Sequence, residues 1–185
     1  MNIHRIINNT KSEGPGNRVA IWTQGCSRHC KGCMAKDTWP HINNQKMSIE
    51  EILSIVTKNP TIEGVTILGG EPFEQVQELS QLTQGIKDKG LSTIIFTGYT
   101  YEQLRDSGNS YIEAILSSID VIIDGPYIQE LRSFSRPMVG SDNQRFIFLT
   151  DTYSLADFQT NTIEVRISKG GIVQYNGMGE FDKFM

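Results

Sequence analysis

Short apolar runs recur along the chain, and each one ends in glycine, proline or polar residues. Runs of this length, rich in β-branched side chains and bounded by turn residues, are typical of buried strands. The run from Ile119 to Asp124 is an example, because it closes directly on Gly125-Pro126. The pattern predicts strands at residues 18–23, 64–68, 92–97, 119–124 and 145–149.

Segments with helical spacing lie between the predicted strands. Ser48 and Glu51 form a capping-box pattern in front of an apolar stripe that begins at Ile49. Pro72 stands near the start of a second such segment, where its missing N–H costs nothing. Since strand, loop and helix alternate, the sequence favours a parallel α/β sheet, either open or curled into a partial barrel. The predicted helices are 49–59, 72–90, a short one opened by 100–103, and 111–116.

The segments outside this alternation are less regular. Residues 1–17 are expected to form an irregular lead-in, which closes on a Gly-Pro-Gly turn signal. Residues 127–144 are polar and contain helix breakers, which predicts a long functional loop that is partly helical. Within 150–185 we expect a helix and then a terminal hairpin that pairs 163–168 with 172–175.

The length and composition of the chain predict a single globular domain over residues 1–185. The chain has 38% hydrophobic and 21% charged residues, enough for one sizeable core, which we place at 18–149. A net charge of −4 without a run of Lys or Arg argues against binding to nucleic acid. The apolar runs fall far short of the roughly 20 residues that span a bilayer, and the polar start of the chain is unlike a signal peptide. We expect a cytoplasmic protein with neither a nucleic acid nor a membrane as partner.

All three cysteines lie in one loop after the first predicted strand, at Cys26, Cys30 and Cys33. The C-x3-C-x2-C spacing offers three soft thiolate ligands to one metal centre, which suits an iron–sulfur cluster. Structural zinc almost always takes four protein ligands, so a zinc site would also need His29 or His41. A cluster with three protein ligands leaves one iron open. Clustered thiols without disulfide partners elsewhere suit a reducing compartment.

Further motifs stand at the ends of the later strands, and together with the cysteine loop they resemble the radical S-adenosylmethionine superfamily. Over residues 1 to about 149, the pattern is similar to the small anaerobic ribonucleotide reductase activating proteins, a family of glycyl-radical-enzyme activases. Met34-Ala35 stand where that family usually has an aromatic residue followed by Asn. The matching elements are Glu13 to Arg18, Thr38-Trp39, Gly69 to Pro72, Thr97 to Thr100, Val121 to Pro126 and Gly140 to Arg145.

The resemblance implies a curved, mostly parallel sheet, a partial (β/α) barrel of the radical SAM type. It implies a 4Fe-4S cluster held by Cys26, Cys30 and Cys33, with S-adenosyl-L-methionine on the open iron. Reductive cleavage of this cofactor would give a 5′-deoxyadenosyl radical that abstracts a hydrogen atom from a glycine of a large glycyl radical enzyme. The implied partner is the anaerobic ribonucleotide reductase, and the implied electron donor is a flavodoxin- or ferredoxin-type protein.

The resemblance also implies which residues bind the S-adenosylmethionine. Glycines let a ligand approach the backbone, and a carboxylate or carbonyl at Glu71 can accept from the methionine ammonium. Ordinary turn capping is the alternative for Thr97 and Asp124, and core packing is the alternative for Met34. The expected cofactor-binding residues are Gly32, Met34, Gly69, Gly70, Glu71, Thr97 and Asp124.

Other conspicuous residues have plainer alternatives. Arg18, Arg136 and Arg145 are candidates to receive the cofactor carboxylate or an acidic partner surface, or else they are solvated. His29 is expected to be exposed, and Trp39 to anchor the cysteine loop by packing. Two other functions stay open, namely a radical enzyme that acts on a small molecule or peptide, and a cluster- or zinc-binding module without catalysis.

Overall fold

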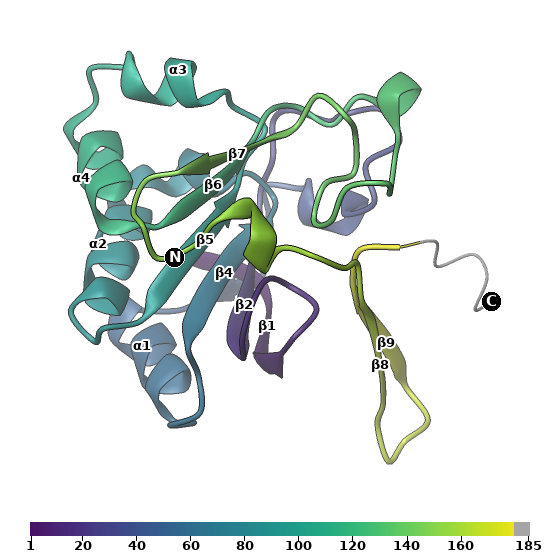
Figure 1. Cartoon of the computed structure of the whole chain (residues 1–185). Helices are drawn as coiled ribbons and strands as arrows, with labels where there is room; N and C mark the ends of the chain where they lie inside the picture. Colours follow the sequence, from purple (N-terminus) through teal and green to yellow (C-terminus); the bar gives the residue numbers. More distant parts are fainter. Residues whose placement is uncertain (180–185) are drawn as a thin grey trace.

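The computed structural model of the chain describes residues 1–179, and its centre is a seven-stranded sheet (Figure 1). The strands are β1 (Asn2–Thr10), β2 (Arg18–Thr23), β3 (Gln45–Lys46), β4 (Gly64–Gly69), β5 (Ser92–Phe96), β6 (Val121–Asp124) and β7 (Arg145–Phe148). Their order across the sheet is β3-β1-β2-β4-β5-β6-β7. The central strands β2, β4, β5 and β6 run parallel, whereas β1, β3 and β7 pair antiparallel. The carboxyl ends of the parallel strands therefore meet at one edge.

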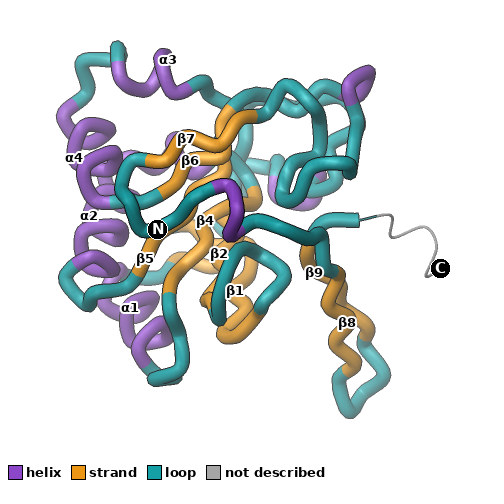
Figure 2. The backbone as a smooth tube through the Cα atoms, in the orientation of Figure 1, coloured by secondary structure: helices purple, strands orange, loops and turns teal. Residues whose placement is uncertain are grey.

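The α-helices lie on one side of the sheet, whereas the other purple segments in Figure 2 are short 3-10 turns. The α-helices are α1 (Ile49–Thr57), α2 (Val76–Lys87), α3 (Tyr101–Arg105) and α4 (Ser110–Ser118). The predicted capping box opens α1, since Ser48 Oγ accepts from Glu51 N and Glu51 Oε2 accepts from Ser48 N. Ile21 of β2 and Ile67 of β4 belong to the same buried cluster as the apolar stripes of α1, α2 and α4. Each fully buried Ile or Leu contributes about 1.5–3 kcal/mol. Within residues 1–179, no helix combines the length and the apolarity needed to cross a membrane.

The opposite face of the sheet is covered without an α-helix in the described part of the chain. Ile94 and Ile123 pack there against Met138, Val139 and Phe158, which come from the segments flanking β7. Farther along this face, Trp22 packs with Ile7, Ala20 and Leu68. Successive residues of the central strands thus pack on opposite faces of the sheet. One face packs against the helices, and the other carries the two smaller apolar clusters.

The amino-terminal segment differs from the irregular lead-in that the sequence predicts. Residues 2–10 form β1, a long strand that pairs antiparallel with β2 and places Ile6 opposite Ile21. Only residues 11–17 are irregular. The prediction was wrong because Asn8 and Asn9 are exposed and the register with β2 is interrupted twice, so the apolar residues of β1 do not alternate as in a regular strand.

The carboxyl-terminal part departs from the predicted parallel order at β7, which pairs antiparallel with β6. The connection 125–144 contains only a 3-10 turn, Gln129–Leu131, and no crossover helix of the kind that a parallel return requires. The predicted long, partly helical loop is thereby confirmed. After residue 150, the expected helix is only a 3-10 turn, Leu155–Asp157. The predicted hairpin is confirmed as β8 (Ile163–Ile167) paired with β9 (Val173–Gly177).

Candidate functional site

A cavity of about 630 Å³ lies at the carboxyl ends of β2, β4 and β5. Parallel α/β folds place their ligands at this edge, and the volume is within the range of small-molecule sites. The cavity lining includes Cys26, Cys30 and Cys33. It also includes the strand-end residues 69–71 and 97–98, and residues 173–177 of the hairpin. Motifs that are far apart in the sequence therefore converge on one space.

The cysteine loop is closed by backbone hydrogen bonds. Gly25 N donates to Thr38 O at 2.8 Å, and Cys26 N donates to Trp39 O at 3.1 Å. His29 has a φ of 45° and lies against the Trp39 ring, with 4.8 Å between the ring centroids. His29 is exposed and Trp39 anchors the loop by packing, as predicted.

The three cysteines are free thiols that line the same cavity. Burial raises the pKa of the Cys26 thiol. Within residues 1–179, no three or more His, Cys, Asp or Glu side chains form an assembled metal-binding group. Neither His29 nor His41 lines the cavity, and His41 Nε2 lies 2.7 Å from Glu74 Oε2. His4 does line the cavity, but its ring nitrogens lie 3.0 Å from Gln24 Oε1 and 3.1 Å from Asp37 Oδ2. Three soft donors on one loop, with no histidine assembled beside them in the described residues, fit an iron–sulfur cluster better than a four-ligand zinc site.

Gly69 and Gly70 hold the end of β4 against the cysteine loop. Gly70 N donates to Thr23 O, and Glu71 N donates to Gly25 O, each at 2.9 Å. A Cβ at position 70 would lie 2.2 Å from Gly25 O, so no side chain fits there. Gly69 adopts a φ of +104°, which favours glycine. The backbone of the cysteine loop makes the close approach at Gly70, and strand β2 makes it at Gly69, where a Cβ would lie 2.7 Å from Trp22 Cα.

The Glu71 carboxylate is buried and braces two strand ends. It accepts from Thr97 Oγ1 at 2.8 Å and from Gly98 N at 2.9 Å through its two oxygens. Phe73 N donates a third hydrogen bond at 3.1 Å. Desolvation outweighs these bonds and raises the pKa of Glu71 to about 7. The structure therefore brings Glu71 and Thr97 together on the cavity wall, each already bonded to the other.

Asp124 lies away from the cavity lining. Its carboxylate is buried and pairs with Arg145, at 2.5 Å between Nη2 and Oδ2. Tyr101 N donates to it at 2.7 Å, and Arg145 also reaches Glu102 at 2.7 Å. Gly125, the next residue, lines the cavity instead. These contacts fit turn capping, the alternative to cofactor binding for Asp124. They also direct the Arg145 guanidinium to Asp124 and Glu102.

Gly32 and Met34 flank Cys33 in different ways. Met34 lines the cavity and is 49% exposed. Gly32 has a φ of +78°, and a Cβ there would lie 3.0 Å from the Gln129 side chain. The positive φ therefore explains the glycine at position 32, which is outside the cavity lining.

The two other candidate arginines bind the protein itself. Arg18 is fully buried, with Nε donating to Thr66 Oγ1 at 2.8 Å and Nη2 donating to Val65 O at 2.9 Å. Arg136 Nη1 donates to Asp142 O and Gln144 O, both at 3.0 Å. Neither Arg18 nor Arg136 is part of the cavity lining, so the structure gives no support to the expectation that they receive a cofactor carboxylate.

Two arginines that the sequence did not single out do line the cavity. The Arg28 guanidinium lies 4.7 Å from the Tyr99 ring centroid, and its Nε is buried without a hydrogen-bond partner among the described residues. Arg5 lies 4.0 Å from the Trp22 ring centroid. The position of Arg28 between Cys26 and Cys30 could have identified it from the sequence as a candidate cavity residue. Arg5 could not be found, because it reaches the cavity only through the unpredicted strand β1.

Comparisons with known proteins concern the same residues. A family model described as "4Fe-4S single cluster domain" matches residues 12–147. The anaerobic ribonucleoside-triphosphate reductase-activating protein of Enterobacteria phage T4 is 34% identical over 158 residues, covering 82% of this chain and 96% of that protein. The protein of the same description from Vibrio cholerae is 32% identical, covering 78% and 96%. The crystal structure of QueE from Escherichia coli overlaps 53% of this chain and 52% of that one, with 25% identity and a TM-score of 0.45.

The matched span contains the cysteine loop and the strand-end residues of the cavity. The family model, which matches residues 12–147, contains neither β1 nor the hairpin. The chain therefore belongs to the 4Fe-4S single cluster domain family and, within it, to the anaerobic ribonucleoside-triphosphate reductase-activating proteins, which makes it a radical SAM oxidoreductase with a 4Fe-4S cluster and S-adenosyl-L-methionine as its cofactors.

Proposed function

We propose that this chain activates an anaerobic ribonucleotide reductase by removing a hydrogen atom from a glycine of that enzyme. When bound, the 4Fe-4S cluster and S-adenosylmethionine supply the chemistry, the reductive formation of a 5′-deoxyadenosyl radical. The observation that carries the proposal is the convergence of the three cysteines with residues 69–71 and 97–98 on one cavity. The relatives' description as reductase-activating proteins supports the choice of partner.

The residues of the chain would hold, orient and shield these cofactors. Cys26, Cys30 and Cys33 would supply the three thiolates. The backbone at 69–71 and the Thr97–Gly98 strand end would face the amino acid part of S-adenosylmethionine, while Glu71 keeps those strand ends fixed. We assign Asp124 a positioning role, because it holds the turn at Tyr101 behind this wall. A cavity that excludes water also protects a reactive species from side reactions.

The same proposal includes the architecture and the setting. The helices on one side and the cavity on the other support a partial (β/α) barrel of the radical SAM type with the cavity on its inner face. We propose that residues 1–185 act as one domain, in the cytoplasm, with a flavodoxin- or ferredoxin-type protein as electron donor.

Anaerobic incubation of the reconstituted chain with the reductase, S-adenosylmethionine and a reductant tests the proposal. We expect a glycyl radical signal on the reductase by electron paramagnetic resonance, and 5′-deoxyadenosine by chromatography. Cys30→Ala should abolish both products together with the absorbance of the cluster. Ser54→Ala, at an exposed position of α1, is the matched control and should retain all three.

Each other function predicts a different outcome. Formation of 5′-deoxyadenosine without a glycyl radical would favour an enzyme that acts on a small molecule or peptide. Binding of S-adenosylmethionine without any 5′-deoxyadenosine would indicate a module without catalysis. A Cys30→Ala protein that keeps its cluster would overturn the assignment of the ligands.

A further inference from the structure

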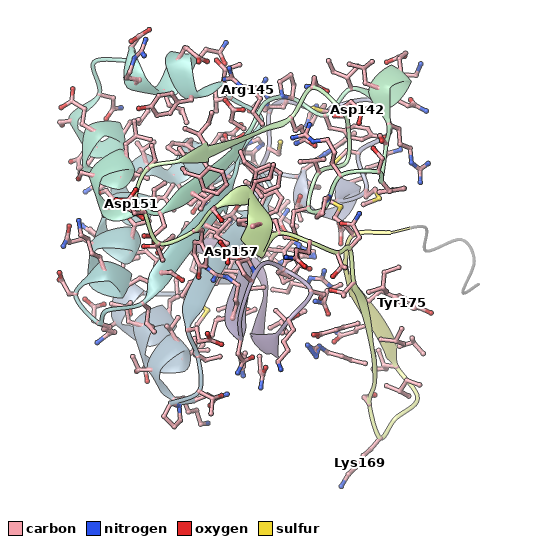
Figure 3. The ribbon with its side chains drawn as sticks, in the orientation of Figure 1. Asp142, Arg145, Asp151, Asp157, Lys169 and Tyr175 are labelled. Atoms are coloured by element: carbon pink, nitrogen blue, oxygen red, sulfur yellow. The ribbon has the colours of Figure 1, made fainter. Side chains whose placement is uncertain are left out.

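The β8–β9 hairpin stands apart from the shared domain. It projects away from the body of the molecule, with Lys169 at its far end (Figures 1 and 3). The family model ends at residue 147, so the hairpin lies beyond the matched region. Residues 173–177 nevertheless line the cavity. An element added to the shared domain thus forms part of the wall of its site.

The two faces of the hairpin differ in polarity. In the β8–β9 register Val165 lies opposite Tyr175, and Ile167 opposite Val173. Successive side chains of a strand point to opposite faces. One face therefore carries Val165, Ile167, Val173 and Tyr175, whereas the other carries Glu164, Arg166, Gln174 and Asn176.

The polar face is the one that binds the body. Glu164 Oε1 accepts from Lys11 N at 2.7 Å, and Arg166 Nη2 donates to Asn9 O at 2.7 Å. Asn176 is buried and its Nδ2 donates to hydroxyl groups of the same segment, at 2.8 and 2.6 Å. Within residues 1–179, the hairpin is therefore joined to the body by hydrogen bonds, and none of its side chains belongs to a buried apolar cluster.

Apart from Tyr175, which is half-buried at the cavity, the apolar face is exposed to solvent. Val165 is 46% exposed, Ile167 72% and Val173 43%, and Ile172 in the turn is 65% exposed. A half-exposed antiparallel sheet normally has the opposite arrangement, with its apolar face on the core. An exposed group of apolar side chains of this kind marks a site of interaction.

We propose that this apolar hairpin face, formed by Val165, Ile167, Ile172 and Val173, docks on the glycyl radical enzyme next to the segment that carries its glycine. The inference rests on the proposed function. Stable interfaces bury about 1,200–2,000 Å² in total, which these side chains alone do not provide. The contact must extend onto adjoining surface, and Val173 joins the patch to the cavity that receives the glycine. A partner engaged at the cavity therefore covers the patch as part of one continuous interface.

The double variant Ile167→Ser with Ile172→Ser tests the docking face. Both residues are exposed, so we expect an unchanged circular dichroism spectrum, cluster content and partner-free formation of 5′-deoxyadenosine. The affinity for the reductase should fall about tenfold or more, equivalent to about 1.4 kcal/mol. Glycyl radical yield should recover when the reductase is in excess. Tyr111→Ser is the matched control, since Tyr111 is 43% exposed on α4, and its affinity should equal that of the wild type.

The possible outcomes separate the docking face from the function. Unchanged affinity of the double variant, with normal radical formation, would overturn the docking face and leave the function intact. A wild-type dimer that the double variant dissociates, without a change in reductase affinity, would assign the face to a second copy and also overturn the proposal. Absence of a glycyl radical with the wild type at every reductase concentration would instead reject the proposed function.

Discussion

Two walls of the cavity are each held by a buried glutamate, but in different ways. On the cysteine side, Glu71 accepts hydrogen bonds from Phe73 N, Thr97 Oγ1 and Gly98 N. On the hairpin side, Glu13 accepts from Gly177 N at 2.6 Å and lies 3.4 Å from Asn176 Nδ2. Burial raises the pKa of each carboxyl to about 7. On each side of the cavity, a buried glutamate therefore joins segments that are distant in sequence.

The walls differ in what stands behind them. The strand ends that Glu71 joins belong to β4 and β5, whose residues fill the main core with α1, α2 and α4. None of the hairpin residues in the described range belongs to a buried apolar cluster. Segments with few buried apolar contacts open at a lower free energy than the core. The comparison indicates one wall that opens only with the whole domain and one that can open separately.

The largest effect is expected for Glu71→Ala. The substitution leaves two buried donors and one partly buried donor without an acceptor, and we expect a loss of about 2–4 kcal/mol in the free energy of unfolding. Formation of 5′-deoxyadenosine should also fall strongly, because both strand ends lose their brace. Urea denaturation and product analysis measure the two effects. Glu113→Ala, at an exposed position of α4, is the control, and equal stability of the two variants would refute the bracing role.

The cavity wall at the ends of β4 and β5, the rigid wall of this comparison, was also the more predictable of the two from sequence. The short β-branched runs, the Ser48 capping box and the glycine breaks follow from local sequence, and they placed β2, β4, β5 and β6 correctly. β1 was missed because a polar strand is recognised by its partner and not by its own hydropathy. The antiparallel return at β7 depends on the absence of a helix in 125–144, and a loop prediction alone does not fix a strand direction.

The site was predictable in its ligand types and less so in its contacts. The cysteine spacing identifies three thiol donors from sequence alone. What the side chains bind depends on tertiary packing: Asp124 turned out to face Arg145, and the glycine at position 70 faces Gly25. The hairpin itself was predicted, but its place in the cavity wall could not be, because β9 reaches the cavity through hydrogen bonds to a segment more than 160 residues away in sequence.

An intermediate effect is expected from pH at the hairpin wall. The pKa of Glu13 is raised from 4.5 to about 7, chiefly by desolvation, although Arg5 opposes the shift and Glu164 adds to it. The folded state therefore favours the protonated Glu13 carboxyl. The free energy that this protonation adds to stability is fully present below pH 4.5 and is lost as the pH rises through 7. Between pH 5.5 and 8 we expect a loss of about 2 kcal/mol from this group.

Urea denaturation of the wild type and of Glu13→Gln at both pH values measures this contribution as a difference. The amide stays neutral and can still accept from Gly177 N, so the variant should be less sensitive to pH than the wild type. Parallel pH profiles for the two proteins would show that Glu13 is ionised at little cost in the folded protein.

The smallest and most local effect is expected for Asn176→Ala. The variant loses the hydrogen bonds to Thr10 Oγ1 and Ser12 Oγ, at about 0.5–1.5 kcal/mol each. Because these bonds join the hairpin to the body and no hairpin residue within 1–179 belongs to a buried apolar cluster, amide hydrogen exchange in β9 should accelerate about tenfold, while exchange in β4 and β5 stays unchanged. Gln174→Ala, at an exposed position of the same strand, is the control. Equal acceleration in β4 and β9 would mean that both walls open together, and the distinction between a rigid wall and a separately opening wall would fail.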